Sequence, residues 1–322
     1  MLTSLSPDLL YLVVFGPGFG ESILLRVPPS DWVVVDCCMS GAFCPPLDLL
    51  RAHNARWSCL VLTHPHTDHS NGLDQVIHHG GEGPVGCVPV WFTSSQWEKS
   101  PDPERHLAEG INEHVLAAID DRWDKDPKAH WELQQGDARK IGGALLTPLW
   151  PDKASISESD RIKDPNRLST PILVEWEELR ILLGADLPAG PWAQIGGLWS
   201  DLGKHAALKV PHHGPTNSIS AVFAAGEPER LWVITPWNRG PTLPRFEDGQ
   251  GVDRLLDFVK ELNLTGLPSQ RETIDQRAFQ VSLPVIQQRG KYASSCIAAG
   301  FDREGKLCDI FCGPGSVVIR RP

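Results

Sequence analysis

The sequence VLTHPHTDHSNGL, residues 61–73, decides how the rest of the chain is interpreted. An apolar run ends at Thr63, and three histidines and one aspartate follow within six positions: His64, His66, Asp68 and His69. Such side chains are costly to bury unless each ring nitrogen and carboxylate oxygen has a partner. Imidazole and carboxylate are ligands of zinc, manganese and iron, and the spacing lets the first two residues and the last two reach different positions. The stretch therefore predicts a metal site between a strand and a helix, rather than a surface loop with chance histidines.

Length and composition predict an ordinary globular protein with one large or two modest domains. The chain has 322 residues, of which 41% are hydrophobic and 22% charged. The net charge of −10 argues against broad, non-specific binding of nucleic acid, although it leaves room for a local basic groove. Residues 1–10 lack the basic start of a signal peptide, and the apolar run 9–15 is too short to span a membrane. We therefore expect a cytoplasmic protein without membrane contact.

The eight cysteines fit free thiols in a reducing compartment. Neither of their two groups contains the paired Cys-x-x-Cys units of a structural zinc site, so buried thiols are favoured over a thiolate metal site. The groups are Cys37, Cys38 and Cys44, and Cys296, Cys308 and Cys312.

Three further apolar runs predict strands that end at polar residues. The strand at 32–35 ends before Asp36, the strand at 179–183 before Asp186, and the strand at 207–210 before His212-His213. If these strands lie in packed sheets, their carboxyl ends gather at one edge. The pattern therefore places four polar groups, including 64–69, near one another.

The remaining chain alternates predicted strands and helices. We expect the polar segment 151–169 to be a long loop able to cover a site, and its Arg161, Lys163 and Arg167 either to guide an anionic backbone or to be simply solvated. Further strands are predicted at 10–15, 22–27, 59–63, 85–92, 141–146, 170–176 and 231–235, and helices at 45–53, 72–79, 103–123 and 252–262.

The ligand pattern over residues 10–262 resembles the metallo-β-lactamase superfamily, with its strand-end Asp, HxHxDH run, later Asp and later His. The phrases LLGAD (182–186) and LKVPHHG (208–214) are most similar to the ComEC-like β-lactamase-like domains of DNA-uptake proteins and their free-standing relatives. The resemblance implies an α/β fold, a four-layer αββα sandwich at 1–265, with a C-terminal β-rich extension at 266–322 packed on it. The membrane channel of the uptake proteins is absent, so DNA transport is not implied.

The same resemblance implies two divalent metal ions, zinc or manganese, and assigns the site residues. Asp186 would be shared between the metals, Asp36 would orient the histidines from behind, and Lys209 would lie beside the site. Asp68 is a ligand or a proton acceptor, and Lys209 either contacts a phosphate oxygen or is a solvated strand-end residue. The implied metal ligands are His64, His66, Asp68, His69, Asp186 and one of His212 and His213.

The function that this resemblance favours is a metal-dependent hydrolase, a two-metal phosphodiesterase or nuclease acting on DNA or RNA. A first alternative is a hydrolase of a small ester, thioester or lactone, which the acidic composition favours. A second alternative is a partner-controlled or non-catalytic module of the same fold. The cysteine-containing tail from Ala278 would then be the docking surface for a protein partner.

Overall fold

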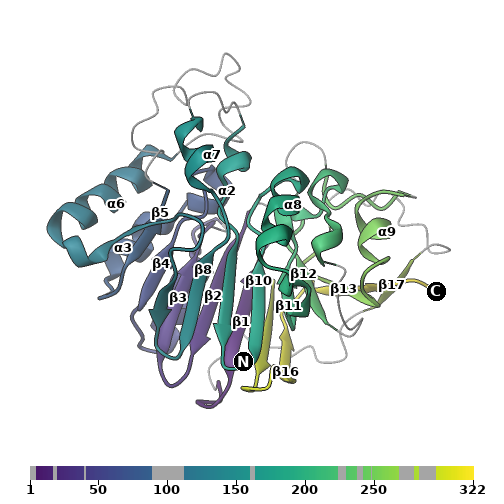
Figure 1. Cartoon of the computed structure of the whole chain (residues 1–322). Helices are drawn as coiled ribbons and strands as arrows, with labels where there is room; N and C mark the ends of the chain where they lie inside the picture. The colour runs from purple at the N-terminus through teal and green to yellow at the C-terminus, as the bar shows by residue number, and fades with distance from the viewer. Residues whose placement is uncertain are drawn as a thin grey trace.

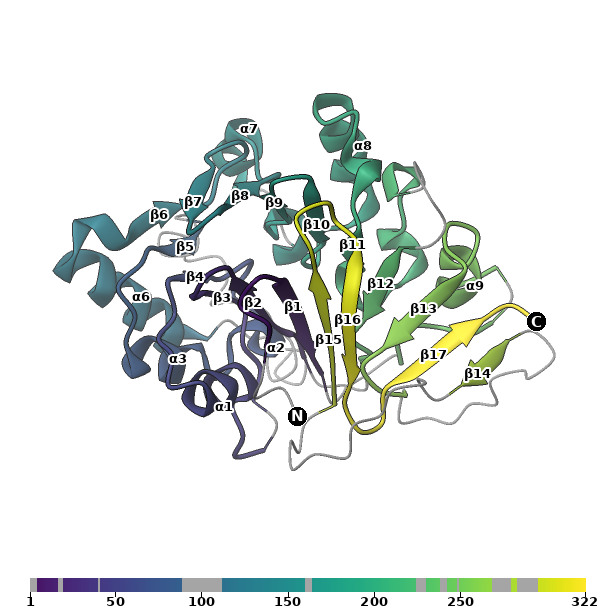
Figure 2. The same ribbon diagram turned by 90° about the horizontal axis from the view of Figure 1, so that it is seen from below.

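The computed structural model describes residues 5–16, 20–39, 41–88, 112–159, 164–223, 230–237, 242–247, 249–267, 279–282 and 295–322. Two β-sheets pack face to face, and helices cover their outer sides (Figures 1 and 2). This arrangement confirms the predicted αββα sandwich.

The first sheet combines antiparallel hairpins with a parallel half. Strands β1, β2 and β3 are antiparallel, whereas β3, β4, β5 and β6 are parallel. Every residue of β1 and β2 is buried, as expected for apolar runs covered on both faces. In sheet order the strands are β16 (Leu307–Cys312), β15 (Cys296–Phe301), β1 (Leu10–Phe15), β2 (Ser22–Val27), β3 (Asp31–Val35), β4 (Cys59–Val61), β5 (Val85–Cys87) and β6 (His130–Glu132).

The second sheet has a parallel centre and antiparallel edges. Strands β10, β11, β12 and β13 are parallel, and β9 runs antiparallel to β10. In sheet order the strands are β14 (Gln280–Ser282), β17 (Val317–Arg320), β13 (Glu261–Leu264), β12 (Leu231–Ile234), β11 (Ala207–Lys209), β10 (Leu179–Leu183), β9 (Ile172–Trp176), β8 (Ala144–Pro148) and β7 (Arg139–Ile141).

Two hydrophobic cores hold the layers together. The larger core joins the facing sides of the sheets to helices α1 (Pro45–Ala52), α3 (Leu73–His79) and α6 (Glu113–Lys125). The smaller core packs the second sheet against α8 (Ala189–Leu198) and α9 (Gly251–Leu255), with Trp192 and Trp232 fully buried. Figure 2 shows α1 and α3 on one outer side and α8 and α9 on the other. Short helices α2 (Thr67–Ser70) and α7 (Lys153–Ser157) follow β4 and β8.

Strand direction gathers the polar residues at one edge of both sheets. Strands β3 and β4 are parallel, so the segments after Val35 and Val61 leave the first sheet on the same side. Strands β10 and β11 are parallel and do the same in the second sheet. Antiparallel β2 and β9 begin at this edge, which places the residues just before them beside the outgoing segments.

The structure corrects several element predictions. The predicted helix 252–262 ends at Leu255, and Glu261–Leu264 is a strand because its backbone pairs with β12 and β17. The predicted strand 141–146 is a hairpin, since Gly142 has a φ of 57° that suits a tight turn. Strand β6 and helix α8 were not predicted. Residues 89–111 lie outside the described part, so the predicted strand 85–92 is seen only from Val85 to Cys87, and the predicted helix 103–123 from Glu113 to Lys125.

The C-terminal strands join the sheets of the main sandwich directly. Strand β15 pairs with β1 in the first sheet, and β17 pairs with β13 in the second. The domain boundary between residues 265 and 266 stays a prediction, whereas the strands beyond it are hydrogen-bonded to strands before it. Among the described residues, no helix has the length and apolar character needed to cross a membrane.

Candidate metal centre

Four buried side chains from both sheets meet at the common edge. Asp68, His69, Asp186 and His213 each offer a ligand atom, and these atoms all lie within 4.8 Å of one another. At most 8% of any of the four residues is exposed. Two come from helix α2 after β4, one follows β10 and one follows β11. The structure thus brings together groups that are 145 residues apart along the chain, from position 68 to position 213.

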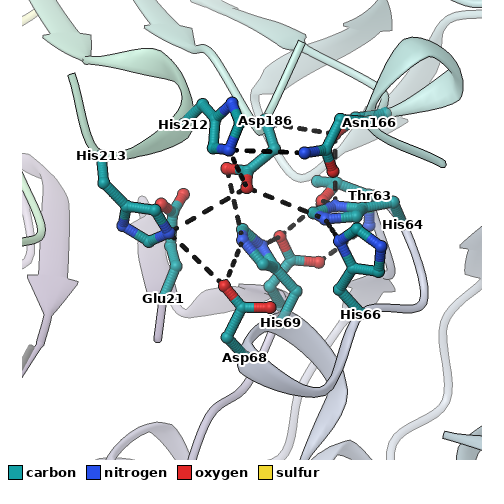
Figure 3. A network of polar contacts seen from close by, with 12 residues as sticks. Glu21, Thr63, His64, His66, Asp68, His69, Asn166, Asp186, His212 and His213 are labelled. Atoms are coloured by element: carbon teal, nitrogen blue, oxygen red, sulfur yellow. Dashed lines mark hydrogen bonds and ion pairs between the residues drawn. The ribbon is translucent and has the colours of Figure 1, made fainter. Parts of the chain in front are cut away.

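His64 and His66 form a second group on the other side of Asp186. The Nε2 atom of His64 lies 3.1 Å from Nδ1 of His66 and 3.9 Å from Oδ2 of Asp186. The Oδ1 atom of Asp186 lies 3.3 Å from Nε2 of His69. Figure 3 shows the Asp186 carboxylate between the two groups of imidazoles. Oδ1 is thus nearest to His69, whereas Oδ2 lies within 4.0 Å of Nε2 of His64, of His212 and of His213.

The donor set fits divalent cations. Nε2 of His69, Nε2 of His213 and Oδ1 of Asp186 are buried and have no hydrogen-bond partner among the described residues. Leaving three such atoms without a hydrogen bond in one place is costly, and a cation would coordinate all of them. Imidazole nitrogen and carboxylate oxygen are ligands of both zinc and manganese. The residues present therefore fit the metal site that the sequence predicts.

Asp36 orients His69 from behind the site. Its Oδ2 accepts a hydrogen bond from Nδ1 of His69 at 2.8 Å and from the Thr63 hydroxyl at 2.6 Å, and its Oδ1 accepts from the Thr63 amide at 2.8 Å. Burial raises the pKa of the Asp36 carboxyl, and these donors work against that rise. A hydrogen bond at Nδ1 fixes the tautomer and turns Nε2 of His69 toward the metal position.

His213 and His212 have different surroundings. Nδ1 of His213 donates a hydrogen bond to the Thr235 carbonyl oxygen at 2.8 Å, which directs Nε2 toward Oδ2 of Asp68 at 3.4 Å. His212 lies at the rim, with Nε2 4.0 Å from Oδ2 of Asp186 and its side chain 27% exposed. Both histidines have positive φ angles, 50° and 57°, which are uncommon for residues with a Cβ. Of the two candidates, His213 is the one inside the compact ligand group.

The segment 151–169, predicted to be a loop over the site, contributes polar contacts to it. Ser169 Oγ accepts from the Asp186 amide at 2.9 Å and lies 3.2 Å from Nδ1 of His64. The side-chain nitrogen Nδ2 of Asn166 lies 3.4 Å from Nε2 of His212. The segment is more structured than expected, since it contains α7 and a turn of 3₁₀ helix at Pro165–Leu168. Arg167 is exposed, and Arg161 and Lys163 lie outside the described residues.

Lys209 does not occupy the position expected of a residue that contacts substrate. Its side chain is fully buried, and its ammonium group forms an ion pair with Glu21, which is equally buried. It also donates to the Val210 carbonyl at 2.8 Å. Glu21 in turn accepts from the Thr235 hydroxyl at 3.2 Å. Because its ammonium group is paired with Glu21 inside the core, Lys209 supports the site from within the protein and does not face a substrate oxygen.

The electrostatic field of the cluster favours a bound cation. Burial works against ionisation of Asp186, but the surrounding imidazoles, His69 foremost, outweigh it and hold the pKa of this carboxyl well below its usual value. Burial and two neighbouring imidazoles hold the pKa of His64 well below its usual value, so the ring is neutral and able to ligate. For His69, burial is outweighed by Asp186, Asp68 and Asp36, which raise its pKa. The same carboxylates would attract a metal ion.

Glu21, Ser169 and Thr235 were not predicted as site residues. Each lies next to a strand terminus at the ligand edge: Glu21 before β2, Ser169 before β9 and Thr235 after β12. The available signal was their place beside predicted strand ends. Single polar residues at such positions are common, however, and which of them pair with one another depends on the packing of the two sheets.

Comparison with known proteins assigns the fold. The model of the metallo-beta-lactamase superfamily matches residues 15–231, and the chain belongs to this superfamily. No curated protein is significantly similar to it. Among solved structures, the CmlA diiron beta-hydroxylase of Streptomyces venezuelae is 15% identical, with a TM-score of 0.38 over 64% of this chain and 35% of that chain. A metallo-beta-lactamase HARLDQ-motif mutant of Cronobacter sakazakii is 15% identical, with a TM-score of 0.33 over 53% and 57% of the two chains.

Proposed function

We propose that this protein is a two-metal phosphodiesterase acting on DNA or RNA, with zinc or manganese as its ions. The observation that carries the proposal is the central position of Asp186, whose Oδ1 lies nearest to His69 and whose Oδ2 lies within 4.0 Å of both His64 and His213. A carboxylate between two sets of imidazoles is suited to sharing its oxygens between two ions. One ion would be held by His64, His66 and Asp186, and the other by Asp68, His69, Asp186 and His213.

Charge supports a phosphate as the substrate group. Two divalent ions outweigh the two carboxylates among the ligands, and the imidazoles are neutral when they ligate. The centre is then positive, although the whole chain has a net charge of −10. The lysine that could have supplied further positive charge is neutralised by Glu21. Attraction for the anionic substrate would thus come from the ions at the site rather than from a basic surface.

Divalent ions bound here would supply a water that ionises near neutral pH and positive charge against a phosphate in its transition state. The chain's own residues fix the geometry. Asp36 and the Thr235 carbonyl hold the far nitrogens of His69 and His213. Asp68 is the most exposed of the buried ligand group, at 8%, and we assign it the second task of accepting a proton from the attacking water.

The sequence around the far ligands supports placement in the ComEC-like group. LLGAD ends strand β10 and carries Asp186, and LKVPHHG runs from β11 into the turn that carries His213. The second phrase also supplies the buried Lys209, whose partner Glu21 comes from the first sheet. The similarity therefore includes residues that tie the two halves of the sandwich together.

The test is a nuclease assay on purified, metal-loaded protein. Labelled single-stranded and double-stranded DNA and RNA would be incubated with added zinc, manganese or magnesium, and with a chelator as control. Cleavage should require the metal and be lost in His66→Ala and Asp186→Ala. The matched control is His78→Ala, because His78 is exposed on α3 away from the site and should be dispensable.

Small esters, thioesters and lactones would be assayed in parallel. Cleavage of one of these compounds, with no cleavage of any nucleic acid by the same metal-loaded protein, would contradict the proposal in favour of the small-molecule alternative. A folded, metal-loaded protein inert toward every compound would contradict it in favour of a non-catalytic module.

A further inference from the structure

A pair of buried thiols lies beside the metal centre, in the segment that follows strand β3. The Sγ atoms of Cys37 and Cys44 are 3.3 Å apart and hydrogen-bonded, and at most 3% of either residue is exposed. Cys44 Sγ also lies 3.8 Å from the carbonyl oxygen of Gly72. A disulfide bond is about 2.05 Å long, so the two sulfurs need to approach by only about 1.3 Å to form one.

The two cysteines are not equivalent. Cys44 is the N-cap residue of α1, where the positive end of the helix dipole favours a thiolate. The hydrogen bond from Cys37 lowers the pKa of the Cys44 thiol, against the effect of burial. Nucleophilic attack on an oxidant requires a thiolate, and formation of a disulfide requires a second thiol within reach. Cys44 fits the first role and Cys37 the second.

An exposed turn directly precedes Cys44 in the chain. Residues 41–43 are exposed, and Phe43 is 54% exposed although it is a large apolar side chain. Gly41 has a φ of 61°, a conformation that a turn with glycine adopts without strain. Both cysteines belong to the larger hydrophobic core, and Cys44 directly follows this exposed turn.

We propose that Cys37 and Cys44 form a reversible disulfide, a modification site whose oxidant is a hydroperoxide. The sulfur of Cys44 attacks the peroxide oxygen, the O–O bond breaks, and the other oxygen leaves as water or an alcohol, giving a sulfenic acid on Cys44. The sulfur of Cys37 then attacks the sulfur of Cys44. The S–O bond breaks, and the hydroxide takes the proton of Cys37 and leaves as water. A dithiol reductant reverses the change by thiol–disulfide exchange.

The position of the pair links it to the metal centre. The amide of Cys37 donates to the carbonyl oxygen of His69 at 2.7 Å, and the preceding residue is Asp36, which holds the His69 ring. Movement of Cys37 toward Cys44 thus acts on the backbone that positions a ligand. Loss of such an orienting contact costs about tenfold to a hundredfold in metal affinity. This consequence rests on the proposed metal centre, whereas the disulfide itself does not.

The disulfide is tested by mass spectrometry of the full chain. The protein is treated with hydrogen peroxide, its remaining thiols are blocked with N-ethylmaleimide, and it is digested with trypsin. The peptide 27–51 contains Cys37, Cys38 and Cys44, and no other cysteine. After oxidation we expect this peptide to have lost two hydrogens and to carry one label in place of three. Fragmentation should show a bond between its first and third cysteine. After reduction with dithiothreitol and renewed labelling, the peptide should carry all three labels.

Variants assign the bond. Cys38→Ser should keep it, and Cys37→Ser and Cys44→Ser should abolish it, while fragmentation of the wild-type peptide decides the pairing even if a variant fails to fold. Cys308, the exposed cysteine among the described residues, reports that the oxidant has acted. The proposal is overturned if Cys308 is oxidised while the peptide keeps three labels, if the bond uses Cys38, or if Cys44 is converted to a sulfinic acid without forming a bond.

The link to the metal centre is tested with manganese, which thiolates bind weakly. Manganese affinity would be measured for the reduced and the oxidised chain. We expect at least tenfold weaker binding after oxidation and recovery after reduction. Equal affinity in the two states would overturn the link. If the reduced chain binds neither manganese nor zinc, the proposed function fails, and the labelling experiment still decides the disulfide.

Discussion

The buried Lys209–Glu21 pair makes a quantitative prediction. In Lys209→Met, Glu21 keeps one hydrogen bond from the Thr235 hydroxyl, and its Oε1 has no partner. Removing one partner of a buried ion pair costs about 3–5 kcal/mol, because the other charge stays desolvated. The Val210 carbonyl also loses a donor, which adds about 1 kcal/mol. We therefore expect Lys209→Met to lower the free energy of unfolding by about 4 kcal/mol or more.

The double variant Glu21→Gln with Lys209→Met separates charge from packing. It removes both charges and keeps similar volumes, so its loss should fall to about 1–2 kcal/mol. The assay is urea unfolding followed by the fluorescence of the 12 tryptophans, with linear extrapolation. Lys204→Met is the matched control, because Lys204 is exposed, and it should stay within about 0.5 kcal/mol of wild type. The account of this pair is refuted if Lys209→Met behaves like the control, or if the double variant is no more stable than Lys209→Met.

Three further predictions concern orientation, pH and packing. Asp36→Asn should weaken manganese binding by about tenfold to a hundredfold in an equilibrium titration, because it alters the carboxylate that accepts the hydrogen bond from Nδ1 of His69. Unchanged affinity would show that this hydrogen bond is dispensable. Burial lowers the pKa of His205 to about 4 from an ordinary value of 6.5, so its neutral ring contributes stability above pH 6.5 that is lost as pH falls toward 4. Urea titrations should show about 3 kcal/mol of this loss in wild type and its absence in His205→Gln; parallel pH profiles of the two proteins would contradict the prediction. A Cβ at Gly20 would lie 2.3 Å from the Asp68 carbonyl oxygen, so Gly20→Ala should cost about 1–3 kcal/mol in thermal unfolding, whereas Gly197→Ala, with open space around it, should not destabilise the protein.

Much of the site architecture was predictable because its ligands follow apolar strands. The runs before Asp36, His64, Asp186 and His212 have the composition of buried strands, and parallel strands leave a sheet at a common edge. That rule is local to each strand and needs no knowledge of how the sheets face each other. It was sufficient to place residues from four separate segments at one site, whereas the αββα layers were predicted from the resemblance to the metallo-β-lactamase superfamily.

Apart from that of Asp36, the supporting contacts were not predictable, because they depend on packing between distant segments. Lys209 looks in sequence like a strand-end lysine near a phosphate, and only the proximity of Glu21 in the other sheet shows that its charge is already paired. The misassigned helix 252–262 has a similar cause. Its apolar spacing suits a helix, but the backbone of Glu261–Leu264 pairs with two strands, one of which is more than 50 residues later in the chain.

The central claim is that Asp186 joins two metal positions built from the two groups of histidines. The most direct test is the number of zinc ions and of manganese ions bound per chain, each measured separately by elemental analysis after equilibrium dialysis of wild type, Asp186→Ala and the control His78→Ala. The account predicts two ions in wild type and in the control, and the loss of at least one in Asp186→Ala. A wild-type chain that binds no ion, or an Asp186→Ala chain that still binds two, would contradict it.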